Sequence, residues 1–310
     1  MTMKKINLVA FPGAPNLPIF AAIENGYFES FDLDIKLETT TSSVWQMKSL
    51  LNNEFQIAAT AVDNVVAYQE NQGAVSFDFD PDLFIVMGAS QVELSLIAAP
   101  NITSINDLRG KSLALDALAT GFAFVLYRML EIGGLKKPDC EYIPVGATPQ
   151  RWESVKAGLH SATLTIEPFT SIAISQGYNV LSTSTNIFDH YQGGVFTASE
   201  KWAAKNIDTL QNFIEGYLMG LKWVLDDFNN IKACEILLKN MPLLKKDSVQ
   251  RVIDKLKNPR TGLTPRATIS IEGLEQVLEL RSNYHSGKKE LNDPYKYIDL
   301  SYYDNVIKNI

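Results

Sequence analysis

The sequence predicts an α/β protein with two lobes, each built on a parallel β-sheet, followed by a helical C-terminal region. Short apolar segments rich in β-forming residues alternate with segments of helical periodicity, and this alternation restarts after residues 88–90. From residue 201 onward the periodicity is almost entirely helical. The length of 310 residues suits two domains of ordinary size.

The first α/β unit begins with an apolar strand over residues 6–11, which ends at a Pro-Gly loop. A helix is expected over 17–25, where apolar residues recur at helical spacing and Gly26 is typical of a helix C-terminus. The expected order then continues through a strand at 31–37, a helix at 44–53, a strand at 57–60, a helix from 61 and a strand at 83–87.

Gly88, Ala89 and Ser90 form a small-residue break, which we expect to be a flexible hinge before the second unit. That unit is expected to comprise strand 94–99, short helix 104–110, strand 112–115, helix 122–132, strand 141–145, helix 149–158, strand 162–166, helix 169–176 and strand 179–181. Residues 182–194 are predicted to be irregular. Further helices are expected at 207–226, 229–240, 247–256 and 271–285, with a tail at 291–310 that packs across the surface.

Composition and charge exclude several functional classes. Hydrophobic residues make up 46% and charged residues 20%, as in ordinary globular proteins. Lys and Arg total 28 against 35 Asp and Glu, so the net charge of -7 argues against nucleic acid as a partner. The two cysteines and three histidines (Cys140, Cys234, His160, His190, His285) lack the spacing of a metal site, and we expect neither a metal nor a cofactor.

Ligands of such sheets bind beyond the carboxyl ends of strands, where loops meet helix N-termini. Residues 116–122 are the sharpest candidate, because free N–H groups at a helix start, with the Thr120 hydroxyl and Gly121, make an anion site. Alternatively, Asp116 or Thr120 only caps the helix. If the site is anionic, Gly121→Asp should abolish binding by placing a carboxylate where the anion sits.

Other candidates have two interpretations each. Asp63 and Asn64 start another predicted helix and either contact ligand or cap the helix. Asn16, between two prolines, either orients a ligand or is a turn residue. Arg151 either faces the cleft or is a solvated surface charge, and Tyr191 either stacks on a ligand or packs. The expected ligand-binding set is Asn16, Asp63, Asn64, Ser90, Asp116, Thr120, Gly121, Phe122, Arg151, Glu167 and Tyr191.

No catalytic residue is predicted. The sequence has no G-x-S-x-G elbow, no G-x-G-x-x-G and no P-loop, and Cys140 has no histidine or asparagine at a diagnostic spacing. Phe213, Tyr217, Met219 and Trp223 are interpreted as the buried face of a helix.

Several segments together resemble one family. Residues 15–29 (PNLPIFAAIENGYFE), 33–37 (LDIKL) and 106–114 (NDLRGKSLA) resemble type II periplasmic substrate-binding proteins of the alkanesulfonate, nitrate and thiamine-pyrimidine-precursor group. The segment 146–158, the Glu167-Pro168 pair and QGYNVL (176–181) resemble the second-lobe pattern of that group. The resemblance covers nearly the whole chain.

The resemblance implies a Venus-flytrap protein, with lobe 1 from 1–90 plus 195–310 and lobe 2 from 91–194, that closes on its ligand. It implies capture of a small polar or anionic organic molecule for an ABC-type importer, with a transporter permease as partner and the chain as a monomer. The alternatives are a cytosolic enzyme on the same scaffold, similar to desulfinases and related lyases, or a ligand sensor. The CCCFC segment of the pyrimidine synthase branch is absent, so its iron-dependent suicide chemistry is not expected.

The location follows from the N-terminus. The apolar run after Met1 is too short for the core of a signal peptide, and no stretch approaches the roughly 18 apolar residues of a membrane span. We therefore expect a periplasmic protein if the chain is a trimmed mature form, and a cytoplasmic one if Met1 is the true start.

Overall fold

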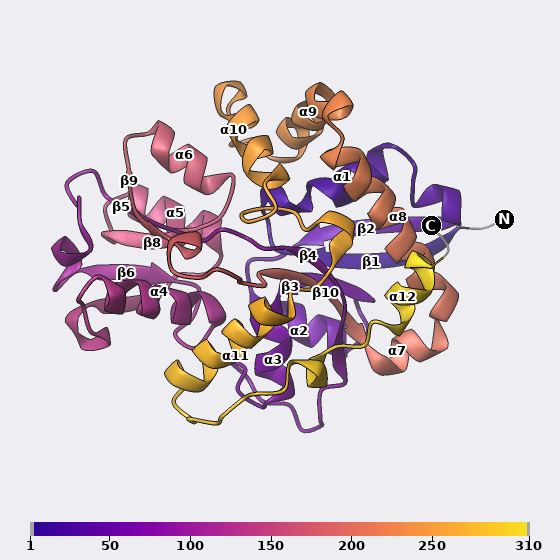
Figure 1. The fold of residues 1–310 in the computed structure, drawn as a ribbon, viewed down its shortest axis with the longest axis horizontal. Coiled ribbons are helices and arrows are strands. Elements are labelled where there is room, and N and C mark those ends of the chain that lie inside the picture. The colour runs from indigo at the N-terminus through magenta and orange to yellow at the C-terminus, as the bar shows by residue number, and fades with distance from the viewer. Residues whose placement is uncertain (1–2, 309–310) are drawn as a thin grey trace.

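The computed structural model describes residues 3–308, which form two five-stranded sheets flanked by helices (Figure 1). We call the parts built on these sheets the first and the second lobe. The first sheet has the order β2-β1-β3-β10-β4 and the second the order β7-β6-β8-β5-β9. The limits of the lobes as moving bodies, at residues 90/91 and 194/195, stay a prediction.

Both sheets are mixed, whereas parallel sheets were predicted. The strands of the first sheet are β1 (Lys4–Ala10), β2 (Leu33–Thr39), β3 (Ile57–Ala61), β4 (Leu83–Ser90) and β10 (Gly194–Ser199). β1 runs parallel to β2 and β3, but β10 lies antiparallel between β3 and β4. The sequence analysis missed β10, which re-enters the first sheet after the chain has traversed the second lobe.

The second sheet repeats this arrangement. Its strands are β5 (Ser95–Ala98), β6 (Ser112–Leu115), β7 (Glu141–Pro144), β8 (Ala162–Thr165) and β9 (Asn179–Thr183). β6 runs parallel to β7 and β8, whereas β5 lies antiparallel between β8 and β9. The predicted strands of this lobe are therefore confirmed, but their common direction is not.

Most helices lie where the periodicity predicts them, but those at Glu200–Lys205 and Ser301–Ile307 were not predicted. Those of the two sheet units are α1 (Leu17–Glu24), α2 (Ser43–Leu51), α3 (Val62–Gln69), α4 (Gly121–Ile132), α5 (Thr148–Lys156) and α6 (Phe169–Ser175). The C-terminal region adds α7 (Glu200–Lys205), α8 (Ile207–Leu225), α9 (Asn230–Asn240), α10 (Lys246–Lys257), α11 (Ile271–Tyr284) and α12 (Ser301–Ile307). α8 packs on α1 so closely that a Cβ at Gly220 would lie 2.4 Å from the Pro18 carbonyl oxygen. α11 packs against α3 and also against α4 of the second lobe (Figure 1).

Residues 88–90 continue a strand, where we predicted a break, and their role as a hinge stays a prediction. They end β4, and the loop at 262–268 lies against them: Thr264 donates its backbone N–H to the Ala89 carbonyl at 3.0 Å. A Cβ at Gly88 would lie 2.2 Å from the Thr268 carbonyl oxygen, so the small residue serves close packing. The chain crosses between the sheets at 91–94 and again at 184–193.

Two further properties hold for residues 3–308. None of the helices there has the length and apolar character needed to cross a bilayer. No group of three or more His, Cys, Asp and Glu side chains in that range is arranged to hold a metal ion.

Candidate functional site

A cavity of about 960 Å3, measured to include its open mouth, lies between the two lobes. Its wall in the first lobe comes from the loop after β1, the end of β3 with the start of α3, and β4 with β10. Its wall in the second lobe comes from the starts of α4 and α5 and the end of β8. The cavity therefore lies at the carboxyl ends of parallel strands, where the sequence analysis placed the ligand.

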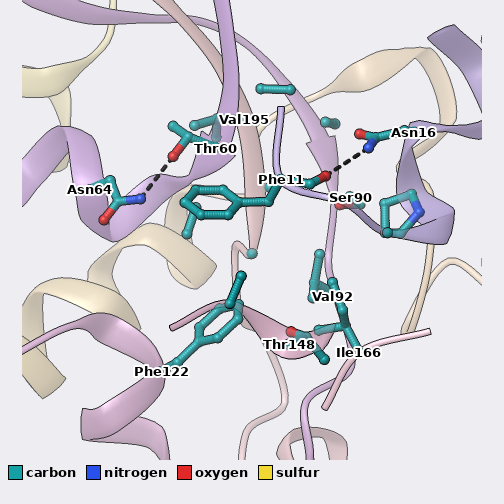
Figure 2. Close-up of a pocket in the computed structure, with 18 of the residues that line it drawn as sticks. Phe11, Asn16, Thr60, Asn64, Ser90, Val92, Phe122, Thr148, Ile166 and Val195 are labelled. Atoms are coloured by element: carbon teal, nitrogen blue, oxygen red, sulfur yellow. Dashed lines mark hydrogen bonds between the residues drawn. The ribbon is translucent and has the colours of Figure 1, made fainter. Parts of the chain in front are cut away.

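The wall is mostly apolar and carries two phenylalanines from opposite lobes. Phe11 follows β1 and Phe122 lies in the first turn of α4, and their rings lie on two sides of the cavity (Figure 2). Val92 and Ile166 lie along another side (Figure 2). Such a wall suits a flat, largely apolar molecule.

Two asparagines of the first lobe line the cavity with their amides fixed in orientation. Asn16 donates from Nδ2 to the Phe11 carbonyl at 2.7 Å, and Asn64 donates from Nδ2 to Thr60 Oγ1 at 2.8 Å (Figure 2). Within residues 3–308, neither Oδ1 atom has a hydrogen-bond partner. Both amides therefore have an acceptor left for a ligand.

Thr120 caps α4, as one of the two predicted interpretations requires. Its hydroxyl oxygen accepts from the Ala123 N–H at 3.4 Å, and the same hydroxyl donates to Asp116 Oδ1 at 2.8 Å. Asp116 lines the cavity, and burial raises the pKa of its carboxyl, although the Arg151 charge opposes the shift. Asp116 therefore adds a second type of acceptor to the wall.

Arg151 is not a solvated surface charge. It is 2% exposed, and protein oxygens hold its guanidinium from four directions. It donates to the Gly146 carbonyl at 2.7 Å, Thr163 Oγ1 at 3.2 Å, Thr148 Oγ1 at 3.1 Å and the Leu164 carbonyl at 3.2 Å. Arg151 thus links the start of α5 to β8 in the second lobe, and protein acceptors bind most of its N–H groups.

Asp63 crosses to the second lobe and occupies the N-terminus of α4. Its Oδ2 accepts from the Gly121 backbone N–H at 2.6 Å. Arg281 of α11 donates from Nε to Oδ1 at 2.7 Å and from Nη2 to Oδ2 at 2.6 Å. The place where the sequence analysis expected a ligand's anion therefore holds a carboxylate of the chain itself.

Arg281 has no exposed surface and contacts both lobes. Besides Asp63, it donates to Gln72 Oε1 at 3.1 Å and to the Ala119 carbonyl at 3.2 Å, and its guanidinium lies 5.1 Å from the centre of the Phe124 ring. The sequence analysis missed this residue. A signal was present, because Arg281 falls on the apolar face that Leu274, Val277 and Leu278 define at helical spacing.

Two of the expected site residues do not line the cavity. The Glu167 carboxylate accepts from the Ser171 N–H at 3.3 Å and from Ser171 Oγ at 3.1 Å, and faces a separate small cavity. Tyr191 stacks on Phe188 with ring centres 5.7 Å apart and borders another cavity, so packing is its observed role. The remaining expected residues line the interlobe cavity: Asn16, Asp63, Asn64, Ser90, Asp116, Thr120, Gly121, Phe122 and Arg151.

Tyr217 is a lining residue that the sequence analysis assigned to the core. It is 1% exposed and packs against Phe196 with ring centres 4.6 Å apart. Both residues border the cavity, and within the described part of the chain the Tyr217 hydroxyl has no hydrogen-bond partner. Other lining residues outside the predicted set include Phe11, Thr60, Val92, Thr148, Ile166, Val195 and Phe196. They come mostly from strand ends, where sequence patterns do not distinguish a cavity wall from a core.

Comparison with known families identifies the chain. The model of the NMT1-like family matches residues 3–238. The chain belongs to the NMT1-like family. A comparison with curated protein sequences gives no significant match.

Solved structures share the fold of this NMT1-like chain at low sequence identity. A protein from Bordetella bronchiseptica RB50 is 18% identical with a TM-score of 0.80, over 98% of this chain and 97% of that one. The periplasmic nitrate-binding protein NrtA from Synechocystis PCC 6803 is 12% identical with a TM-score of 0.79, over 99% and 89%. The alkanesulfonate-binding protein SsuA from Xanthomonas axonopodis pv. citri, bound to MOPS, is 15% identical with a TM-score of 0.73, over 94% and 95%. The NMT1-like chain therefore has the fold of the periplasmic binding proteins, as its sequence predicts.

Proposed function

We propose that this chain is a solute-binding protein that captures a small organic molecule between its lobes and delivers it to an ABC-type importer. The observation that carries the proposal is the interlobe cavity, to which each lobe contributes an aromatic ring and polar groups. Relatives in fold that are described as nitrate-binding and alkanesulfonate-binding support a binding role. Neither the cysteines nor the histidines are among the lining residues, so the cavity offers no thiol or imidazole for catalysis.

The ligand that fits this wall has a flat, apolar body and hydrogen-bond donor groups. Phe11 and Phe122 offer ring faces or edges to such a body (Figure 2). The fixed amide oxygens of Asn16 and Asn64 only accept hydrogen bonds, and the Asp116 carboxyl adds a further acceptor. The guanidinium groups near the cavity are held by protein oxygens, as shown above for Arg151 and Arg281. Of the two expected ligand classes, the polar uncharged one therefore fits better than the anionic one.

The lobes are in contact around the cavity, which fits a closed form. Ala14 of the first lobe donates its backbone N–H to the Glu167 carbonyl of the second at 3.0 Å, and Gly121 donates to Asp63 at 2.6 Å. Opening would require rotation about the crossings at 91–94 and 184–193, with the lobes limited to 1–90 plus 195–310 and to 91–194. Release of the ligand would follow from this opening.

The same function implies partners and a place in the cell. A binding protein for an importer works as a monomer that docks to a transporter permease. It works in the periplasm once it has been exported. We propose both for this chain by its likeness in fold to periplasmic binding proteins.

A thermal-shift screen followed by mass spectrometry of the mixture tests the proposal. The panel should contain amino-substituted heteroaromatic rings, aromatic carboxylates, alkanesulfonates and nitrate. We expect a donor-bearing flat ring to raise the melting temperature, because a ligand that binds only the native state stabilises it. The ligand should be recovered unchanged. Conversion of the ligand to a product would instead show an enzyme, and a complete lack of stabilising small molecules would contradict a binding role.

A further inference from the structure

We propose that Asp63 determines specificity by excluding small anions from the cleft. Its carboxylate, fixed by Arg281, fills the position at the N-terminus of α4 that an anionic group of a ligand would otherwise take. The inference rests on the proposed solute-binding function and names a feature of its ligand: the ligand does not place an anion at this helix terminus.

Asp63 fills a position that attracts anions. α4 has twelve residues, so its N-terminus carries unpaired N–H groups and a partial positive charge. Asp63 Oδ2 lies 2.6 Å from the Gly121 nitrogen, which is a charge-assisted hydrogen bond. The Arg281 guanidinium lies on the other side of the same carboxylate. A helix terminus and a buried cation together make a strong anion site, and this one already has an occupant.

The Asp63 side chain cannot easily leave the N-terminus of α4. Both of its oxygens are bonded, and the Asp63 side chain is 3% exposed. If it turned away, Arg281, which is 0% exposed, would be left as an unpaired charge in the interior. The fit to α4 is also tight, since a Cβ at Gly121 would lie 2.6 Å from Asp63 Cβ. The occupant is therefore part of the closed structure.

The Asp63 carboxylate also affects which ligands the cavity accepts. Asp63 itself lines the cavity, and so does Asp116. An anion at this end of the cavity would lie against the Asp63 carboxylate, which already takes up the Gly121 N–H and the Arg281 guanidinium. The guanidinium that does line the cavity, that of Arg151, donates to protein oxygens and has little capacity left for an anion. The start of α4 therefore has no free cation to offer an anion, and the cavity suits uncharged or donor-bearing molecules better.

Removing the carboxylate should convert the protein into an anion binder. In Asp63→Ala, the Gly121 N–H and the Arg281 guanidinium face a vacated space of carboxylate size. We expect acetate and methanesulfonate to bind Asp63→Ala at least about tenfold more tightly than the native chain, measured by isothermal titration calorimetry at constant ionic strength. The matched control is the double variant Asp63→Ala/Arg281→Met, which lacks the cation and should lose the gained affinity.

Three outcomes would overturn the proposal. The native chain could bind methanesulfonate as tightly as Asp63→Ala, or a folded Asp63→Ala could fail to bind either anion. The double variant could also bind as tightly as the single one. If Asp63→Ala does not fold in chloride, refolding in acetate becomes the readout. Refolding in acetate supports the proposal, and failure to refold in acetate overturns it.

These results are separate from the proposed function. The anion titrations do not require the natural ligand, and the ligand screen on the native chain does not require Asp63→Ala. Suppose that the native chain binds a donor-bearing ring but the variant gains no anion binding. That result would contradict only the specificity role of Asp63. A gain of anion binding without any ligand in the screen would sink the binding function alone.

Discussion

Arg281 and Asp63 are 218 positions apart in the sequence and form a buried bidentate pair, with bonds of 2.7 and 2.6 Å, at the boundary between the lobes. The same guanidinium reaches the Ala119 carbonyl of the second lobe at 3.2 Å. Because α11 carries Arg281, the C-terminal helical region contributes directly to the contact between the lobes. A residue near the C-terminus thus joins the two lobes beside the cavity.

Arg281→Met should destabilise the protein strongly. The substitution leaves the Asp63 carboxylate buried without its cation, and breaking a buried pair in this way costs about 3–5 kcal/mol. Urea unfolding would measure the change in the free energy of unfolding. The matched control is Glu279→Gln, which breaks the pair between Arg128 of α4 and Glu279 of α11 in a solvent-exposed place. That loss should stay below about 1 kcal/mol, and equal losses in the two variants would contradict the role given to Arg281.

Gly121→Ala should weaken ligand binding by preventing full closure. The added Cβ would lie 2.6 Å from Asp63 Cβ and 2.8 Å from Asp63 Cγ, across the contact between the lobes. Overpacking of this kind costs about 1–3 kcal/mol, which corresponds to a loss of affinity of roughly 5-fold to 150-fold. Small-angle scattering should show a larger radius of gyration with ligand present. Alanine favours helix more than glycine does, so α4 itself should not suffer. Native-like affinity would show that the lobes close without this contact.

Phe122→Ala should lower ligand affinity with little effect on folding. Phe122 is half-buried at the edge of the core and lines the cavity, so part of its ring is available to a ligand. Loss of such an aromatic contact should weaken binding by about tenfold or more, measured by calorimetry with the ligand found in the screen. Phe228→Ala is the control, because Phe228 is 99% exposed and far from the cavity in sequence and structure. Equal effects of the two substitutions would remove Phe122 from the site.

Local periodicity was sufficient to predict most of the fold. Strands such as β6 (Ser112–Leu115) and helices such as α4 were predicted within about a residue of their observed bounds, because burial on one face leaves a periodic pattern in the sequence. β10 was missed, and with it the mixed direction of the first sheet. Its partners β3 and β4 are more than 100 positions earlier in the chain, and no local pattern records that pairing.

Most of the expected site residues line one cavity, but the contacts that they make could not be predicted from the sequence. The loops at strand ends and the start of α4 do line the cavity, because fold class and chain direction determine where they meet. The electrostatics depend on long-range contacts. From the sequence, Asp63 could be interpreted only as a cap or a ligand contact, since its partner Arg281 lies on a helix near the C-terminus. Similarly, Tyr217 has helical spacing typical of a core residue, and only the folded structure places it at the cavity.

Tyr217→Phe should leave the ligand-free protein as stable as the native chain or more so. The Tyr217 hydroxyl is buried and has no hydrogen-bond partner within residues 3–308, so it has lost water without compensation. Removing it should raise the free energy of unfolding by up to about 1 kcal/mol. Tyr297→Phe is the contrasting variant, because the Tyr297 hydroxyl donates to Glu70 at 2.8 Å. That variant should lose about 1–2 kcal/mol, and a larger loss in Tyr217→Phe would reveal a partner for its hydroxyl.

Glu70, just after α3, should make the stability of the protein depend on pH in the acid range. Burial would raise the pKa of its carboxyl, but hydrogen bonds from Lys289, Lys296 and Tyr297 outweigh burial and lower the pKa from 4.5 to about 2. The folded state therefore holds the proton less tightly than the unfolded state does. The stabilisation is fully present above the unfolded pKa of 4.5 and is lost as the pH falls from there towards about 2.

Urea unfolding of the native chain and Glu70→Gln at several pH values would measure this contribution. Between neutral pH and about pH 3, the native chain should lose on the order of 2 kcal/mol more than the variant, because the amide cannot titrate. Glu24→Gln is the control, since the Glu24 pair with Lys239 is solvent-exposed and should change the profile little. Native and Glu70→Gln profiles that run parallel through this range would show that the three partners do not stabilise the Glu70 carboxylate. The segment that they anchor, residues 289–297, would then be held to α3 by its apolar contacts, such as those of Leu291.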